Sequence, residues 1–379
     1  MTRRLLIASS LYNGVLRLLA VACGAAVLAA CHHDADAPAT GSLRRVVVVY
    51  MAAQNSLGAL RQHVEDSTEI MAGRRYLHPH DRVLLFIDDE AAPRLYSIDR
   101  EHDKPQLLRH WTHDACSTDS GPEGNMSNTG AEMAVDDIAR AVHGAGLHLR
   151  YIFMDCCLMQ TLETAYALRQ VCDYITASPA PIPGSGANYE HQLRNGLLAD
   201  DPTAMARTYL ADVQDEAQQT HYGDFGLVIS CLRTDRLDAL AAALHAALPH
   251  ATLAGHTEAD MTNVLHYLTY SPSYGYRPHS YDARQALSTL LPAAQQTAVL
   301  ACLDDAVVWR GATEACWIGP HDWQFAHIDT AAGHYAAVSM FVPQSIYTTQ
   351  AARCWYGDLN QAFQSTAWYA ACGFSSTGW

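Results

Sequence analysis

Three short apolar runs constrain the fold of this chain more than any other feature. They are Val46–Tyr50, Val83–Ile87 and the strand Leu149–Met154, which is centred on Tyr151, Ile152 and Phe153. Strands without polar alternation are buried on both faces, which is typical of parallel sheets covered by helices. The runs and the helical spacing between them therefore predict an α/β fold with a mostly parallel sheet and helices on both faces.

The remaining elements are predicted from spacing and turn residues. A helix follows the first strand, with Asn55 or Ser56 placed to cap it and Leu57, Leu60, Val64 and Ile70 recurring at about helical spacing. The second strand leads into a hairpin, Arg94–Ile98 with Gln106–Trp111. Other predicted helices are Met133–Val142, Leu162–Val171 and Arg236–Leu248, and other predicted strands are Tyr174–Ala177, Phe225–Ile229 and Ala336–Val342.

The first thirty residues have the pattern of a secretory signal. A basic start with Arg3 and Arg4 precedes an apolar stretch, which ends in LAAC at Cys31. This ending resembles a bacterial lipobox, in which the cysteine is lipidated, whereas the alternative is an ordinary cleaved signal. We expect residues 1–30 to be a lipoprotein signal peptide and residues 31–43 a flexible tether. The mature protein would then be lipid-anchored in a bacterial cell envelope, periplasmic or surface-exposed, with the membrane as a partner through Cys31.

Charge and cysteine usage narrow the function. Removing the signal peptide takes away Arg3, Arg4 and Arg17, so the net charge falls from −15 to −18, which argues against nucleic acid as a partner. Nine of the 11 cysteines remain once Cys23 is removed and Cys31 is lipidated, and an odd number leaves at least one thiol unpaired. With no C-x-x-C pair and no H-E-x-x-H motif, we expect neither a metal nor another cofactor.

The segment MDCCLMQ, residues 154–160, is the strongest candidate for chemistry. Asp155, Cys156 and Cys157 directly follow a predicted buried strand, where loops of an α/β sheet carry catalytic groups. A helix beginning near Leu158 would favour a thiolate through its N-terminal dipole. Spacing alone leaves the plainer alternative that these cysteines are small side chains at the end of a buried strand.

Several segments together resemble the clostripain family of cysteine peptidases, whose fold is caspase-like. DCCLMQTLETAY resembles the D-A-C-L-M segment that holds the family's nucleophile, and VVVVYMAAQNSL and DDEAAPRLY resemble its opening strands. CDYITASPAPIPGSGANY resembles the stretch that follows the cysteine, and later counterparts extend to LNQAFQSTAWYAACGF. The resemblance implies a caspase-like α/β peptidase domain over residues 44–250 and a C-terminal α+β region packed on it over residues 251–379.

The resemblance also assigns roles to individual residues. Cys157, which directly precedes Leu158-Met159, takes the nucleophile's position, and Asp155 matches a pocket acid that favours Arg or Lys before the scissile bond. Ser178, in the Ser-Pro stretch, belongs to the same substrate-binding region. Ser185 supplies no further acid, so basic specificity is less firmly implied than peptidase ancestry.

The histidine is where this sequence departs from the family, which carries its base in a His-Gly motif beside the cysteine strand. In one alignment, the segment from Trp111 to Asp114 replaces that motif. His113 is then the base, with His110 as the alternate. In this alignment Gln106–Trp111 supplies the strand that bears it. In the other, which fits Ser117-Thr118-Asp119 better, the hairpin simply continues and the helix, strand and histidine are absent.

Three hypotheses follow from these observations. The first is an active lipid-anchored cysteine endopeptidase that acts on a peptide or protein substrate. The second is a degenerate relative that binds a peptide or a surface partner without cleaving it. The third, from outside the family, is a redox or metal-binding lipoprotein that uses Cys156, Cys157 and the abundant histidines.

Overall fold

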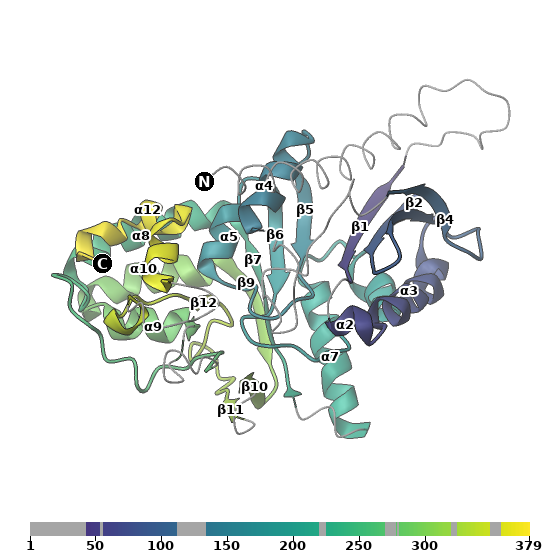
Figure 1. Ribbon diagram of the computed structural model, residues 1–379. Coiled ribbons are helices and arrows are strands. Elements are labelled where there is room, and N and C mark those ends of the chain that lie inside the picture. Colours follow the sequence, from purple (N-terminus) through teal and green to yellow (C-terminus); the bar gives the residue numbers. More distant parts are fainter. Residues whose placement is uncertain are drawn as a thin grey trace. The chain divides into compact units, whose positions relative to one another are not determined.

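The computed structural model describes residues 43–53, 56–111, 134–219, 225–269, 278, 280–319, 324–348 and 358–379. Their contacts form two compact units, which are described one at a time (Figure 1). Unit 1 combines the described residues up to His148 with Ala187–Asp200, and unit 2 combines Leu149–Gly186 with Asp201–Trp379. The lipidation candidate Cys31 lies outside the described residues.

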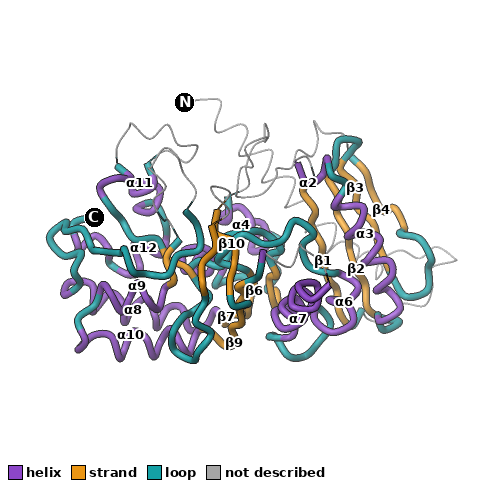
Figure 2. The backbone as a smooth tube through the Cα atoms, turned by 90° about the horizontal axis from the view of Figure 1, so that it is seen from below, coloured by secondary structure: helices purple, strands orange, loops and turns teal. Residues whose placement is uncertain are grey.

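Unit 1 contains a four-stranded sheet in the order β1-β2-β3-β4 (Figure 2). Its strands are β1 (Arg45–Ala52), β2 (Asp81–Asp88), β3 (Pro93–Ile98) and β4 (Gln106–His110). The β1–β2 pair is parallel, and the hairpin strands β3 and β4 continue the sheet in antiparallel fashion, as the sequence predicts. Burial differs between the two parallel strands, because β2 is buried on both faces whereas Val46 and Val48 of β1 are 43% and 37% exposed.

The helix predicted after β1 is broken into two. α2 (Ser56–Ala59) and α3 (Gln62–Gly73) are separated by Arg61, whose φ of +63° is left-handed and cannot continue an α-helix. Leu60 is 73% exposed, so the predicted single apolar face is wrong at this position, although Ile70 is fully buried as expected. Unit 1 also contains a 3₁₀ turn (Arg74–Tyr76), α4 (Val135–Gly144), α6 (Tyr189–His191) and a π turn (Gln192–Gly196).

Unit 2 is built on a second sheet in the order β5-β6-β7-β9. The strands are β5 (Leu149–Phe153), β6 (Cys172–Ala177), β7 (Val228–Arg233) and β9 (Val307–Ala312). Only the β5–β6 pair is parallel, and the other two pairs are antiparallel. β9 lies in the C-terminal part of the chain, after residue 250, and shares this sheet with β5 to β7.

Helices cover both faces of this sheet. α7 (Ala204–Gln219) packs against β6, β7 and β9, whereas α5 (Leu162–Leu168) packs with α8 (Leu237–Ala247) on the other side in both views. The remaining helices are α9 (Ala283–Leu290), α10 (Ala293–Ala306), α11 (Leu359–Gln364) and α12 (Ala367–Cys372). The short strands are β8 (Tyr281–Asp282), β10 (Ala315–Gly319), β11 (Gln324–His327) and β12 (Ser339–Met340). Among the described helices, none has the length and apolar character needed to cross a membrane.

Asp282 fixes β12 and thereby the part of unit 2 that touches the cysteine loop. Its buried carboxylate caps α9 and accepts hydrogen bonds from the Tyr267 hydroxyl (2.7 Å) and the Ala336 N–H (2.8 Å). Burial raises the pKa of Asp282, despite these hydrogen bonds. The strand predicted over 336–342 shrinks to Ser339–Met340, since Ala337 has a φ of +53° that interrupts extended backbone.

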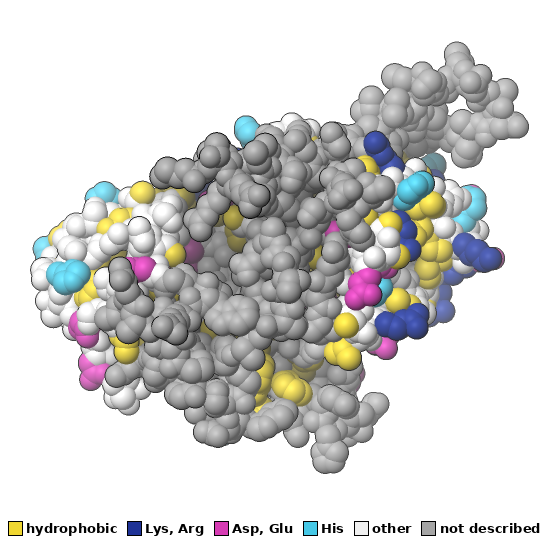
Figure 3. Space-filling view, viewed as in Figure 1, with side chains coloured by type: hydrophobic (Ala, Val, Ile, Leu, Met, Phe, Trp, Pro, Cys, Tyr) yellow, Lys and Arg dark blue, Asp and Glu magenta, His cyan; other side chains and the backbone are white. Residues whose placement is uncertain are grey.

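On the face shown in Figure 3, the dark blue Lys and Arg side chains lie over unit 1. Several arginines of this unit are paired with its carboxylates. Arg74 contacts Asp103, Arg75 contacts Glu190 and Arg94 contacts Asp89. The positive charge of these three arginines is therefore balanced locally.

The Arg45–Asp81 ion pair gives a prediction about pH. Asp81 is fully buried, and burial would raise the pKa of its carboxyl, but two hydrogen bonds from Arg45 and one from the His78 N–H outweigh this and lower the pKa. Because the pKa of the Asp81 carboxyl is lower in the folded protein than its ordinary value of 3.8, the ionised carboxylate stabilises the fold above pH 3.8. This stabilisation is lost as the pH falls below that value and the carboxylate is protonated in the folded protein.

We therefore expect the free energy of unfolding of Asp81→Asn to be about 2 kcal/mol lower than that of wild type at pH 7. The difference should shrink as the pH falls below 3.8, measured by urea unfolding between pH 6 and pH 3. Asp238→Asn is the matched control, because the Arg169–Asp238 pair has a similar distance of 2.8 Å but a carboxylate that is 72% exposed. A constant difference for Asp81→Asn across this range would contradict the proposed coupling.

Candidate active site

The cysteine pair follows β5 at the carboxyl end of the only parallel strand pair in the described part of unit 2. The Met154 N–H still bonds to the Thr176 carbonyl of β6 (2.9 Å), and the chain then leaves the sheet at Asp155. Cys156 is exposed and Cys157 is half-buried. The structure thus places both cysteines beyond a strand end, as the sequence predicts.

The loop after Cys157 runs antiparallel to the segment that follows β6. The Leu158 N–H bonds to the Ala180 carbonyl (3.1 Å), and the Gln160 N–H bonds to the Ser178 carbonyl (2.9 Å). At the end of this two-segment ribbon, the Ile182 N–H donates to the Cys157 Sγ at 3.4 Å. We call residues 157–160 with residues 178–182 the cysteine ribbon.

The helix after the cysteines begins later than the expected start near Leu158. α5 begins at Leu162 and is capped by the Thr161 side chain, which accepts the Thr164 N–H (3.0 Å). Leu158 has a φ of +61°, and its N–H is committed to the ribbon, so no helix can begin there. The dipole explanation for a Cys157 thiolate is therefore wrong, and the Ile182 amide is the donor that lies against the sulfur.

Gln160 anchors the cysteine ribbon to the rest of unit 2. Its side chain is fully buried, and Nε2 donates to both the carbonyl oxygen and the Oγ of Ser230 on β7, each at 2.9 Å. Its carbonyl accepts the Ser339 N–H of β12 (2.9 Å). Sequence reasoning missed this residue, since a glutamine three positions after a cysteine carries no pattern of its own.

Asp155 lies against the turn formed by residues 183–186. Gly186 has a φ of +67°, and a Cβ at this position would lie 2.6 Å from the Asp155 Oδ2. The Gly186 N–H closes the turn onto the Pro183 carbonyl (3.0 Å). The second glycine of PGSG is therefore required for both its backbone conformation and the close approach of the carboxylate.

Ser178 is also in the cysteine ribbon, but its hydroxyl is used locally. The side chain is buried, and its Oγ donates to the Ala180 carbonyl (2.9 Å) and accepts the Ala180 N–H (3.1 Å). Its carbonyl accepts the Gln160 N–H. The structure thus shows Ser178 shaping the turn on which the ribbon is built.

The two candidate bases have different outcomes. His113 lies outside the described residues, and His110 is an exposed residue on β4 in unit 1, opposite Arg94 of β3. Among the described strands of its sheet, β4 pairs only with β3, and the assignment of the base to this segment stays a prediction. Among the described residues, β1 and β5 are edge strands of their respective sheets.

Four other described cysteines are buried and are poor nucleophiles. Burial raises the pKa of Cys172 and Cys316 to about 12 and that of Cys231 to about 11, so these thiols are protonated at neutral pH. Burial also raises the pKa of Cys372. Within the described ranges, no three His, Cys, Asp or Glu side chains gather into a group that could hold a metal ion.

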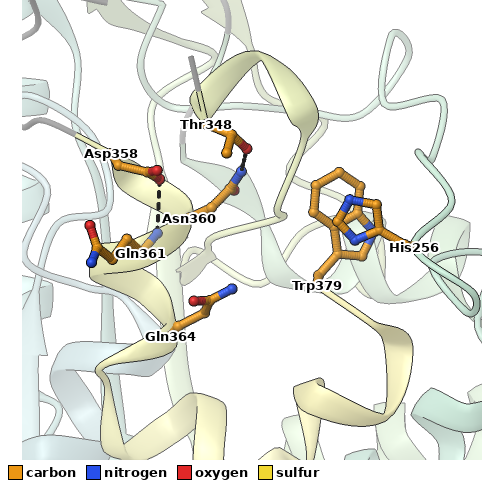
Figure 4. A pocket seen from close by; sticks show the side chains of 7 residues that line it. All are labelled: His256, Thr348, Asp358, Asn360, Gln361, Gln364 and Trp379. Carbon is orange, nitrogen blue, oxygen red and sulfur yellow. Dashed lines mark hydrogen bonds between the residues drawn. The ribbon is translucent and has the colours of Figure 1, made fainter. Parts of the chain in front are cut away.

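A separate hollow lies near the C-terminus (Figure 4) and is lined by His256, Thr348, Asp358, Asn360, Gln361, Gln364 and Trp379. His256 stacks on the Trp379 ring at 3.9 Å, and its Nδ1 contacts the Gly378 carbonyl at 2.8 Å. None of the lining residues belongs to the cysteine ribbon or to the 183–186 turn. His256 therefore serves to hold the C-terminal end in place.

A cysteine presented at a strand end of a helix-covered α/β sheet, beside a glycine turn that holds a carboxylate, defines the class of cysteine hydrolases with a caspase-like fold. Residues 124–372 match the sequence profile of the Clostripain family, and the chain belongs to this family. No curated protein gives a significant sequence match.

Solved structures show the same fold. A secreted C11 cysteine protease from Bacteroides thetaiotaomicron, in complex with an irreversible peptide inhibitor, matches with a TM-score of 0.70 and 21% identity, over 88% of this chain and 99% of the other. An inactive zymogen C11 protease from Parabacteroides distasonis matches with a TM-score of 0.69 and 21% identity, over 89% of this chain and 99% of the other. A B. fragilis cysteine protease matches with a TM-score of 0.54 and 22% identity, over 67% of this chain and 99% of the other. The chain thus has the caspase-like fold.

The contact between Gly186 and Asp155 can be tested with a pair of alanine variants. Gly146→Ala adds a side chain at a φ of +68° where nothing lies within 4 Å, so it should cost about 1 kcal/mol of unfolding free energy. Gly186→Ala has nearly the same φ but must also displace the Asp155 carboxylate, and should cost about 3 kcal/mol. Urea unfolding measures both, and equal costs would contradict the close packing at Gly186.

Proposed function

We propose that this protein is a lipid-anchored cysteine endopeptidase of the clostripain type that cleaves peptide or protein substrates with Cys157 as nucleophile. A histidine, His113 or alternatively His110, takes the thiol proton, and the thiolate attacks the peptide carbonyl. The C–N bond then breaks, the amine leaves with the proton from the imidazolium, and water hydrolyses the thioester. The Cys157 N–H and a neighbouring amide are the candidate donors to the oxyanion.

The observation that carries this proposal is the placement of Cys157 itself. In a chain of the clostripain family, it is half-buried at a strand end, and a backbone amide donates to its sulfur. Cys172, Cys231, Cys316 and Cys372 are buried thiols with raised pKa values. Cys157 is therefore better suited than these four thiols to attack a bound peptide.

The proposed preference is for Arg or Lys before the scissile bond. A carboxylate pairs well with a guanidinium or ammonium group, and Asp155 lies against the 183–186 turn, two residues before the nucleophile in sequence. Ser178 supports this region through its two hydrogen bonds to Ala180, which hold residues 178–180 of the cysteine ribbon. Asp155 gives the pocket its charge, and Ser178 acts on substrate binding through the backbone.

Labelling with an irreversible thiol-reactive peptide that carries Arg tests this function. We expect wild type and Cys156→Ala to be labelled at similar rates. The labelling rate of Cys157→Ala should be at least 100-fold lower, because the reacting atom is removed. A peptide with Glu in place of Arg should label at least tenfold more slowly. If wild type and Cys157→Ala label equally, the peptidase proposal fails.

A second candidate function is peptide binding without cleavage. None of the described strands in the sheet β5-β6-β7-β9 carries a histidine, which is what the alignment without a catalytic histidine leads one to expect. An Arg-containing peptide that binds wild type in fluorescence polarisation, remains intact after prolonged incubation and loses affinity with Asp155→Ala would support this alternative.

The lipid anchor at Cys31 is the remaining part of the proposal. We expect full-length protein made in a bacterial host to partition into the detergent phase, with an N-terminal peptide whose mass includes acyl chains on Cys31. Cys31→Ala should move the protein to the aqueous phase. Detection of wild type in the aqueous phase with an unmodified N-terminus would show an ordinary signal peptide instead.

A further inference from the structure

The partner of the Cys157 sulfur has an unusual setting in the sequence. Ile182 lies between Pro181 and Pro183, so its amide is the only N–H in three consecutive residues. Each flanking proline also restricts its neighbour to extended backbone. The position of this single donor is therefore set by the chain itself, before any ligand arrives.

The cysteine ribbon holds this donor in register with the sulfur. Bonds join the Leu158 N–H to the Ala180 carbonyl and the Gln160 N–H to the Ser178 carbonyl. Ile182 follows two residues after Ala180, and its N–H contacts the Cys157 side chain. The buried Gln160 side chain ties the ribbon to Ser230 of β7. Moving Ile182 away from Cys157 requires these bonds to shift as well.

The two segments of the cysteine ribbon offer the Cys157 sulfur no side-chain cation. The ionisable groups on its own loop are Asp155 and Cys156, and Glu163 follows at the first turn of α5, where burial raises the pKa of its carboxyl. Residues 178–186, SPAPIPGSG, contain no ionisable side chain. An anionic sulfur therefore gains no side-chain cation from either segment of the ribbon, and the Ile182 N–H is the positive partial charge that these segments offer it.

We propose that the Ile182 amide is a positioning residue for the nucleophile: its N–H holds the Cys157 sulfur in place and stabilises the thiolate. Its consequence for peptide cleavage rests on the proposed function, whereas its effect on the thiol does not. A hydrogen bond to a charged acceptor is stronger than one to a neutral acceptor, so the donor favours ionisation of the thiol.

Ile182→Pro removes this N–H with little other change, because the segment is already confined to extended backbone by its neighbours. In a Cys156→Ala background, the rate of Cys157 alkylation by iodoacetamide is followed against pH by peptide mass spectrometry. We expect the midpoint, which reports the thiol pKa, to rise by about one unit in Ile182→Pro. Ile182→Val keeps the N–H and should retain the midpoint of the parent.

A second variant covers the case in which Ile182→Pro fails to fold, as judged by circular dichroism. Gln160→Met keeps the side-chain volume but removes the donors to Ser230, so the register loosens and the midpoint should also rise. A folded Ile182→Pro with the midpoint of Ile182→Val overturns the proposal, as does an unchanged midpoint in Gln160→Met when Ile182→Pro is unfolded. A raised midpoint in a protein that no peptide probe labels instead supports the amide's role and removes the peptidase proposal.

Discussion

The buried amide of Gln160 is the interaction on which the functional edge of unit 2 depends. It joins the loop that leaves β5 to β7 through Ser230, whose Oγ in turn donates to the Ala337 carbonyl (2.7 Å). Burying an amide N–H₂ group away from water costs several kcal/mol of folding free energy unless the group donates its hydrogen bonds inside the protein. The cysteine loop can therefore take few other positions, because leaving this one exposes or orphans the Gln160 donors.

The strands were predictable because burial on both faces leaves a direct mark on composition. Val83–Ile87 and Leu149–Met154 correspond to strands within a residue or two, and the hairpin pairs as expected. The breaks were not predictable, since Arg61 and Leu158 adopt left-handed backbone that nothing in their side chains favours. At Leu158 a hydrogen bond to the Ala180 carbonyl, which is distant in the sequence, overrides local preference, whereas the Arg61 N–H bonds locally to the Gly58 carbonyl.

The site was predictable only in part for a similar reason. Resemblance assigns proposed roles to Cys157 and Asp155, because those roles belong to side chains and can be read from the sequence. The roles of Ile182 and Gly186 belong to the backbone, through an N–H and a positive φ, so they depend on geometry rather than on residue chemistry. The Pro-Ile-Pro triplet was the available signal, because it isolates one amide donor.

The proposed nucleophile, Cys157, and the described candidate base, His110, belong to different units of the chain. Every hydrogen bond described for the cysteine ribbon is made within unit 2, whereas His110 belongs to a hairpin of unit 1. An amide donor stabilises a thiolate and so assists attack, but it cannot give a proton to the departing amine, which a peptide bond requires. A thiol held in this way remains reactive toward alkylating groups without a histidine. Cleavage of a peptide bond additionally requires an acid. Reactivity at Cys157 and peptidase activity are therefore distinct properties, and a substitution can remove one without the other.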